Sequence, residues 1–187
     1  MKEQMDLAQA TMRSFILCPF FVVTSDTSCL HGANVSTISY VGVLSEQPPI
    51  IGLAVRPECH THALILENKL FTLNLPSQKL LADMDFCGTF SGKTHGKIFL
   101  RKLEMEKIGP KELPAIKNSP LALTCSLKTT LFLSRNGASH DYFIADILSA
   151  HAEEGFRIEE HRAIVTANRD YRLVAESLGQ AFHLWRV

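Results

Sequence analysis

Hydroxyl side chains and an arginine gather in one short stretch of the first third of the chain, and their types suit an anion. Ser36, Thr37 and Ser39 lie among small apolar residues in G-A-N-V-S-T-I-S-Y-V-G-V. Arg56 follows the apolar run I-I-G-L-A-V, and Thr61 opens the helical pattern T-H-A-L-I-L-E. Arginine presents a planar fork to phosphate oxygens, and a helix start adds unpaired backbone amides. These residues predict a site for a phosphate-bearing ligand. The alternative is that the hydroxyls simply suit strands and helix starts and that Arg56 is a surface charge.

Two further segments carry polar groups that could act on a ligand. The loop Cys87–Gly96, C-G-T-F-S-G-K-T-H-G, offers Ser91, Lys93 and the nearby Lys97 as a second set of donors. Its S-G-K-T lacks an upstream glycine at phosphate-loop spacing, so by itself it indicates only a loop. His140 lies near the start of S-H-D-Y-F-I-A-D-I. It either places an imidazole beside a substrate at the mouth of a barrel or is a capping or exposed histidine.

The sequence lacks the common metal and catalytic motifs. Cys59-His60-Thr61-His62 has no second cluster of cysteine and histidine, and a zinc site needs about four ligands, so no metal is expected. No two of the five cysteines form a C-x-x-C pair, which favours reduced thiols in a cytoplasmic protein. G-x-S-x-G, H-E-x-x-H and G-x-G-x-x-G do not occur, so hydrolase, zinc-protease and Rossmann interpretations lack support.

The composition is that of a globular chain without a strong net charge. Its 187 residues suit about one domain, and 46% of them are hydrophobic, with a mean hydropathy of +0.07. Lys+Arg and Asp+Glu both number 19, so the basic field needed for non-specific binding to nucleic acid or an anionic membrane is missing. The apolar run Phe15–Val23 contains Pro19 and is too short to span a bilayer. We expect neither nucleic acid nor membrane as a partner.

Short strands dominate the pattern. Two short helices are predicted, one over Thr61–Asn68 with Thr61 as its cap, and one that Ser77 caps. The segment Ile98–Ile108 is amphipathic but mixed, so its pattern does not decide between helix and strand. Many short strands without long helices between them predict an all-β barrel with helical insertions, not a doubly wound sheet. The predicted strands are Cys18–Thr24, Gly32–Val43 with a bend allowed at its glycines, Ile50–Val55, Leu70–Leu75, Ser119–Phe132 as one long strand or two, and Asp141–His151.

Five segments follow one another in a distinctive order: N-V-S-T-I-S-Y, P-P-I-I-G-L-A-V-R-P-E-C-H-T-H-A-L-I, F-T-L-N-L-P-S, D-F-C-G-T-F-S-G-K and S-H-D-Y-F-I-A-D-I. From about Pro19 to His151, the chain thereby resembles flavoredoxin, a branch of the flavin reductase-like, FMN-binding split-barrel proteins. The resemblance implies a mainly β, six-stranded Greek-key split barrel with a few short helices, which dimerises and holds FMN non-covalently. It also implies a single domain over residues 1–187. Its core covers about 15–152, and its tail, 153–187, packs on the barrel or on a dimer partner.

The resemblance further implies roles for individual residues. The N-V-S-T-I-S strand would flank the flavin ring and ribityl chain, and R-P-x-x-x-T-H would hold the phosphate or its approach. The asparagine of N-x-P-S and the S-G-K loop would complete the cradle. His140 falls where the family has a histidine before its late strand, which would place it beside a nicotinamide as a catalytic residue. The implied cofactor-binding set is Asn34, Ser36, Thr37, Ser39, Arg56, Thr61, His62, Asn74, Ser91, Gly92 and Lys93.

A flavin accounts for the missing catalytic triad, because the redox chemistry belongs to the cofactor. The first hypothesis is an FMN-dependent oxidoreductase in which NAD(P)H reduces bound flavin and electrons pass to free flavin, a redox partner protein or a small acceptor. The second is an FMN-carrying electron-transfer protein that another protein reduces and that has no nicotinamide site. The third is a non-catalytic split barrel that binds haem or another ligand, or serves as an interaction module.

Overall fold

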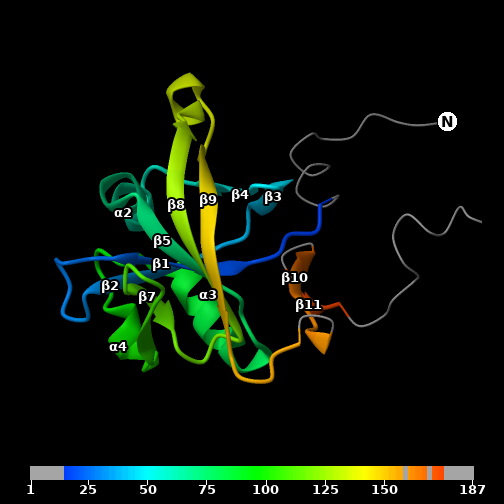
Figure 1. Ribbon diagram of the computed structural model, residues 1–187. Coiled ribbons are helices and arrows are strands. Elements are labelled where there is room, and N and C mark those ends of the chain that lie inside the picture. Colours follow the sequence, from blue (N-terminus) through cyan, green and yellow to red (C-terminus); the bar gives the residue numbers. More distant parts are fainter. Residues whose placement is uncertain (1–14, 158–159, 168–169, 175–187) are drawn as a thin grey trace, which may run out of the picture.

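A sheet of seven strands forms the centre of the protein (Figure 1). The computed structural model describes residues 15–157, 160–167 and 170–174. The strand order is β2-β1-β5-β8-β9-β4-β3, and all neighbouring strands are antiparallel. In chain order these strands are β1 (Phe20–Ser25), β2 (Ala33–Ile38), β3 (Val41–Glu46), β4 (Pro49–Val55), β5 (Leu70–Asn74), β8 (Leu121–Leu131) and β9 (Asp141–Ala152).

The connection between β2 and β3 closes this sheet into a barrel. The two strands lie at opposite ends of the sheet order, yet only Ser39 and Tyr40 separate them in the chain. The Ala54 amide in β4 donates a hydrogen bond to the Tyr40 carbonyl at 2.9 Å, which extends the β3–β4 pairing into the bend. Counted as one bent strand, β2 and β3 give the predicted six-stranded split barrel. The strand predicted over residues 32–43, with a bend allowed at its glycines, is divided into β2 and β3, and the bend lies at Ser39 and Tyr40 instead.

Short helices and small hairpins fill the connections. The β8–β9 hairpin rises above the barrel, and a second hairpin near the C-terminus lies beside the start of β1 (Figure 1). α2 (His60–Asn68) follows β4 and ends at Lys69, whose left-handed backbone (φ 60°) turns its amide toward the Ile65 carbonyl. The other elements are η1 (Gln78–Leu80), α3 (Leu81–Thr89), α4 (Lys97–Arg101), β6 (Met105–Ile108), β7 (Leu113–Ile116), η2 (Leu133–Asn136), β10 (Ile164–Ala167) and β11 (Asp170–Leu173).

The helix limits correct the sequence prediction in three places. Cys59, not Thr61, occupies the N-cap of α2. α3 continues to Thr89, so the glycine-rich loop predicted from residue 87 starts at residue 90. The ambiguous segment 98–108 holds most of α4 and all of β6, which explains why neither a helical nor a strand period fits its whole length.

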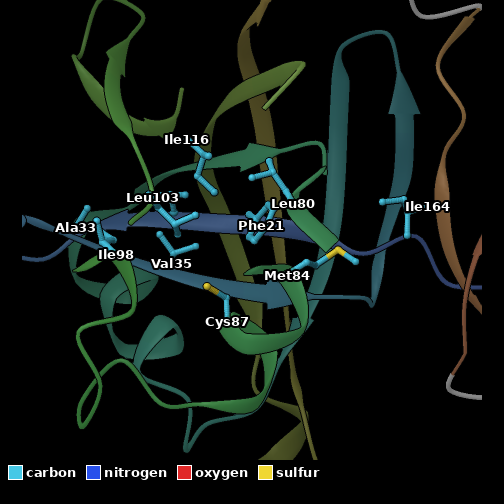
Figure 2. Packing of buried hydrophobic residues seen from close by; sticks show 11 residues of the cluster. Phe21, Ala33, Val35, Leu80, Met84, Cys87, Ile98, Leu103, Ile116 and Ile164 are labelled. Carbon is cyan, nitrogen blue, oxygen red and sulfur yellow. The ribbon is translucent and has the colours of Figure 1, made fainter. Parts of the chain in front are cut away.

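Two hydrophobic clusters lie on opposite faces of β1. Successive side chains of a strand point to opposite faces, so Phe21 and Val23 join one cluster and Val22 joins the other. In the first cluster, Met84 and Cys87 of α3 pack against the β1–β2 face (Figure 2). The second cluster fills the barrel between β1, β4, β5 and β9. Burial of each large side chain contributes roughly 1.5–3 kcal/mol, so these clusters hold the barrel and its helical cover together.

Part of the predicted tail packs on the barrel. Leu17 and Thr166 exchange backbone hydrogen bonds of 3.1 and 2.8 Å, which join β10 to the segment before β1. Ile164 is buried in the first cluster. Residues 175–187 of the predicted tail lie outside the described residues. Within the described ranges, no helix is long and apolar enough to cross a membrane.

Gly52 of β4 lies where added volume should destabilise the barrel. A Cβ there would collide with the ring of Tyr142 on the neighbouring strand β9. We expect Gly52→Ala to lower the free energy of unfolding by about 1–3 kcal/mol, because the ring must leave its place. Urea denaturation followed by circular dichroism measures the change.

Gly42 provides the matched control, because it pairs directly with Gly52 across β3 and β4. A Cβ at Gly42 meets nothing within 4 Å. Gly42→Ala should therefore change the free energy of unfolding by less than about 0.5 kcal/mol. Equal losses in the two variants would contradict the steric explanation.

Candidate functional site

A large groove lies between β2, the start of α2 and the end of α3, and its volume is about 1290 Å³. Ligand sites commonly measure about 300–1,000 Å³, so the space is ample for a nucleotide-sized cofactor. Residues of β4, of the loop after α3 and of the β10–β11 hairpin complete its walls. The predicted site residues that line it are Ser36, Thr37, Ser39, Arg56, Thr61, Ser91, Gly92 and His140.

Two predicted residues lie close to the groove but do not line it. Asn34 is buried, and its Nδ2 donates a hydrogen bond to Thr61 Oγ1 at 2.9 Å. Asn34 therefore positions a lining residue, which leaves the Thr61 hydroxyl hydrogen available to a ligand. Lys93 is exposed on the loop, and its amide donates to Ser91 Oγ at 3.3 Å.

Asn74 and His62, predicted to contact the cofactor, lie inside the protein instead. Asn74 donates to Thr72 Oγ1 and accepts from the Ile116 amide, both at 2.9 Å. His62 Nε2 lies 2.9 Å from Asp141 Oδ2, and both side chains are buried. These polar groups are already bonded to protein partners. Their role is to satisfy buried hydrogen bonds that hold the barrel, which corrects the sequence prediction.

The start of α2 presents unpaired amides to the groove. Cys59 at the N-cap makes no side-chain cap hydrogen bond, and the first turn contains no acidic residue. The first amides of the helix thus lack the acceptor that a capping side chain normally supplies. Gly92 brings the loop backbone close to this point, because an added Cβ would collide with Asn34 Oδ1 and lie 3.4 Å from His60 Cδ2. The positive end of the helix dipole makes this corner suitable for an anion.

Lys97 adds a buried positive charge to the same wall. It is 5% exposed, and its Nζ donates to the Cys87 carbonyl at 2.9 Å. Burial lowers the pKa of Lys97, and nearby Cys87 and Cys59 counteract that effect. No carboxylate pairs with it in the part of the chain that the structure describes. A buried ammonium without an anion is unfavourable, so a negatively charged ligand is favoured here.

His140 lies near Tyr40 and Arg56 in the groove. The rings of Tyr40 and His140 meet edge to face, with centroids 5.2 Å apart and planes at 87°. Ser139 Oγ is 2.8 Å from His140 Nδ1. Burial is the main cause that lowers the pKa of His140, and the positive charge of Arg56 lowers it further. The negative charge of Glu58 raises it, but by less. The imidazole is therefore neutral at pH 7, with one nitrogen that donates and one that accepts.

A second histidine, His60, lines the groove and is held by a buried carboxylate. Its Nε2 lies 2.8 Å from Asp26 Oδ2. Burial raises the pKa of Asp26, but hydrogen bonds from Ser28 and His60 outweigh it, and the pKa falls below its ordinary value. The other nitrogen, His60 Nδ1, is buried without a partner among the described residues. An unpaired buried nitrogen of this kind points to a group that a bound molecule completes.

The family resemblance implies no role for Lys97, His60 or the aromatic walls, and the residues alone indicate Lys97 only as one of a second set of donors near the loop. Lys97 starts a five-residue helix, whose pattern is too short to show which side chains are buried. His60 and Asp26 lie 34 residues apart, so no local motif joins them. Phe90 forms tilted ring pairs with Phe86 at 4.5 Å and with His95 at 4.9 Å, and Phe90 supplies an apolar wall of the groove.

The thiols and metal ligands add no further chemistry. The five cysteines are free. Burial raises the pKa of Cys87 to about 11 and that of Cys125 to about 12, so both remain protonated. Within residues 15–157, 160–167 and 170–174, no group of three or more histidine, cysteine, aspartate or glutamate side chains could hold a metal ion.

The fold is the split barrel of flavin reductases and flavoredoxins. Residues 12–174 match the Flavin reductase like domain, and the chain therefore belongs to this family, as its motifs predict. A curated relative, the NADPH-flavin oxidoreductase of Streptomyces viridifaciens, is 29% identical over 168 residues, which cover 84% of this chain and 82% of the relative.

Solved structures agree on the fold. The flavoredoxin of Desulfovibrio vulgaris (Miyazaki F) superposes with a TM-score of 0.80 at 23% identity, covering 97% of this chain and 99% of that one. An FMN-binding protein from Thermus thermophilus superposes with a TM-score of 0.78 at 19% identity, covering 96% of this chain and 98% of that one. The predicted family and mainly β split-barrel fold are thus confirmed.

The buried His62–Asp141 pair predicts a dependence of stability on pH. Burial raises the pKa of Asp141, but hydrogen bonds from Ser134 and from His62 outweigh this effect. The pKa of Asp141 therefore lies below its ordinary value of 3.8. A lowered carboxyl pKa stabilises the folded state above about pH 3.8, and this contribution is lost as the pH falls through the folded pKa. Asp141→Asn should cost about 1–3 kcal/mol at pH 7, because one buried hydrogen bond loses its acceptor.

Urea denaturation between pH 7 and pH 3 tests this expectation. The gap in free energy of unfolding between wild type and Asp141→Asn should narrow as the pH falls below about 3.8. Asp146→Asn is the control, because Asp146 lies on the same strand in an exposed pair with Lys128 at 3.2 Å, worth about 0–1 kcal/mol. A gap that stays constant with pH would contradict the role of the Asp141 charge.

Proposed function

We propose that this protein binds FMN non-covalently in the groove and acts as an NAD(P)H-dependent oxidoreductase of the flavin reductase type. Electrons pass from NAD(P)H to a free flavin, a partner protein or a small acceptor. The observation that carries the proposal is buried Lys97 beside the uncapped start of α2, in a groove lined by hydroxyl side chains. The name of the Streptomyces relative, NADPH-flavin oxidoreductase, supports the same class.

The polar residues of the groove fit a phosphate. Arg56 and Lys97 supply positive charge, and Thr61 and the first amides of α2 supply further donors. Ser91 and Gly92 bring the loop backbone to the same corner. Nδ1 of half-buried His60 is itself buried and has no partner among the described residues, which fits a site that a ligand completes.

The remaining walls fit a ribityl chain and a flat ring. Ser36 and Ser39 add hydroxyl groups along the groove. Thr37 Oγ1 donates a hydrogen bond to the Met84 carbonyl at 2.6 Å, which connects β2 to α3. The lone pairs of this oxygen remain available to accept a hydrogen bond from a ligand. Tyr40 and Phe90 provide apolar surface for the ring. FMN, when bound, supplies the redox chemistry, and the side chains bind it, orient it and exclude water.

We assign His140 as the catalytic residue that contacts the nicotinamide. Its imidazole is neutral at pH 7, since burial and Arg56 lower its pKa. A neutral imidazole can hydrogen-bond an uncharged amide without placing a second cation beside Arg56. Its edge-to-face contact with Tyr40 fixes the plane of the ring.

A homodimer is also part of the proposal. Val43 and Leu44 are exposed on β3, which pairs only with β4 among the described strands. Leu131 and Leu133 are exposed near the tip of the β8–β9 hairpin. Exposed apolar side chains on a sheet edge and on a projecting hairpin favour burial against a second copy.

An absorption spectrum tests the proposed function. The purified protein, with FMN added if needed, should show bound-flavin bands that bleach when NADH or NADPH is added without oxygen. Flavin bands that bleach with neither nucleotide would favour the electron carrier that another protein reduces. Failure to bind FMN at all would contradict both flavin functions and favour the non-catalytic barrel.

Arg56→Ala should weaken FMN binding about tenfold or more, because a hydrogen bond to a charged group contributes roughly 1.5–3 kcal/mol. Riboflavin lacks the phosphate, so its affinity should hardly change. The side chain of Arg56 is exposed, so stability should change by less than about 1 kcal/mol. Isothermal titration calorimetry with both ligands measures the effect.

Arg157→Ala is the matched control, because Arg157 is exposed in an ion pair with Glu160 at 3.1 Å and does not line the groove. It should bind both ligands as wild type does. If Arg56→Ala weakened FMN and riboflavin equally, the guanidinium would not be the group that holds the phosphate.

A further inference from the structure

One wall of the groove, on the side of the β10–β11 hairpin, is mainly aromatic. Leu17 and Thr166 join the segment before β1 to this hairpin through two backbone hydrogen bonds, and Thr166 pairs with Tyr171 across it. Tyr171 Oη donates to Asp85 Oδ1 at 3.1 Å, which connects the hairpin to α3 (Figure 1). The hairpin wall consists of Phe15, Leu17, Asp85, Phe90, Thr166 and Tyr171.

The aromatic rings of the hairpin wall are open to a ligand. Phe15 is 62% exposed and Phe90 is 39% exposed, and Tyr171 is half-buried. Apolar surface that remains in contact with water is stabilised when another apolar surface covers it. A flat molecule can cover these rings and stack on them.

The hydroxyl groups on this side of the groove already donate to protein acceptors. Thr89 Oγ1 donates to the backbone carbonyl of Asp85 at 2.9 Å, and Thr166 Oγ1 donates to that of Leu17 at 3.5 Å. Burial, the hydrogen bond to Asp85 and the charge of Asp85 all raise the pKa of Tyr171, so its phenol stays protonated. These hydroxyl hydrogens are therefore not available to a phosphate.

Asp85 gives the hairpin wall a negative charge. Its side chain is exposed, and no basic side chain pairs with it in the part of the chain that the structure describes. The lining cations Arg56 and Lys97 follow β4 and start α4. Glu58, the other exposed carboxylate of the groove, acts together with Arg56 on His140. A phosphate on the hairpin wall would be repelled by Asp85, whereas an uncharged ring would not.

We propose that the hairpin wall binds the electron acceptor, and that this acceptor is an uncharged quinone rather than a phosphate-bearing flavin. The inference rests on the proposed function, because the electrons come from NAD(P)H by way of FMN in the same groove. The volume of about 1290 Å³ exceeds the roughly 300–1,000 Å³ of common ligand sites, which leaves space for an acceptor beside FMN. A quinone is flat, stacks on Phe15 and Phe90, and carries no charge that Asp85 repels.

The overall reaction balances with the donor already proposed. NAD(P)H gives up a hydride, which amounts to two electrons and one proton, and a second proton comes from water. The two carbonyl oxygens of the quinone become hydroxyl groups, so the products are NAD(P)⁺ and a hydroquinone.

Titration of the oxidised, FMN-loaded protein measures acceptor binding without turnover, because no electron donor is present. The probes are menadione, which is an uncharged quinone, and naphthoquinone sulfonate, a similar ring system with a negative charge. Quenching of the flavin fluorescence reports the binding of each. We expect wild type to bind menadione about tenfold more tightly than the sulfonate, because Asp85 repels the charge.

Two variants separate the roles of charge and stacking. Asp85→Asn should strengthen sulfonate binding until the two affinities agree within about twofold, with menadione binding unchanged. Phe15→Ala should weaken menadione binding about fivefold and leave FMN affinity unchanged. Asp146→Asn and Phe99→Ala are the matched controls. Phe99 is 69% exposed, close to the 62% of Phe15, and neither Phe99 nor Asp146 lines the groove.

Turnover with NADPH gives a second measurement. Wild type should reduce menadione with a kcat/KM about tenfold higher than that for added free FMN, since the phosphate meets Asp85. Asp85→Asn should lower the KM for added FMN and leave kcat unchanged, because the carboxylate affects binding of the acceptor and not the transfer of electrons.

The outcomes separate the quinone site from the function on which it rests. Normal FMN binding and bleaching, with equal affinities of wild type for the two quinones, would overturn the quinone site and leave the proposed function standing. A discrimination that persists unchanged in Asp85→Asn, or a higher kcat/KM for added FMN than for menadione, would overturn it as well. Wild-type protein that does not bind FMN would overturn the proposed function and the quinone site with it.

Discussion

The bend between β2 and β3 is the constraint on which the rest of the structure depends. It lets one segment pair with β1 on one side and with β4 on the other, and the Ala54–Tyr40 backbone hydrogen bond of 2.9 Å holds it. Closure brings the hydroxyl residues of β2 beside the end of β4 and the start of α2. The Asn34–Thr61 hydrogen bond then links the two walls of the groove. Without this bend, the same residues would lie at opposite edges of an open sheet.

Local charge, not net charge, gives the groove its character. The chain has equal numbers of acidic and basic residues, 19 of each, and the groove is lined by both signs, with Glu58 and Asp85 exposed and Lys97 buried. Lys97 lies buried without a carboxylate partner in the described part of the chain, Arg56 lies at the end of β4, and α2 begins without a cap. These groups act together because a poorly solvated site weakens their charges less than water does. Asp26 is a buried carboxylate that bonds the groove residue His60, and it is also bonded to Ser28.

The role proposed for this groove is to bind a cofactor, whose own redox chemistry makes acid–base catalysis by the side chains unnecessary. Its histidines are fixed by neighbours: His60 by Asp26, and His140 by Tyr40 and Ser139. Its hydroxyls also bond to the scaffold, as Thr37 does when it donates to the Met84 carbonyl. Side chains held in this way lose less conformational entropy when a ligand binds.

The sequence by itself determined the local features of this protein, and the tertiary structure decided the rest. Apolar runs bounded by proline and polar turns predicted most strands, and the motif order predicted the family. The local pattern of donors near a helix start was enough to predict an anion site at Arg56, Thr61 and the hydroxyls of β2. The burial of Asn74 and His62 could not be found, since their partners Ile116 and Asp141 lie 42 and 79 residues away. Lys97 is predicted from the sequence as a donor near the loop, but its burial and its place in the groove wall come from packing against other elements, which no local period records.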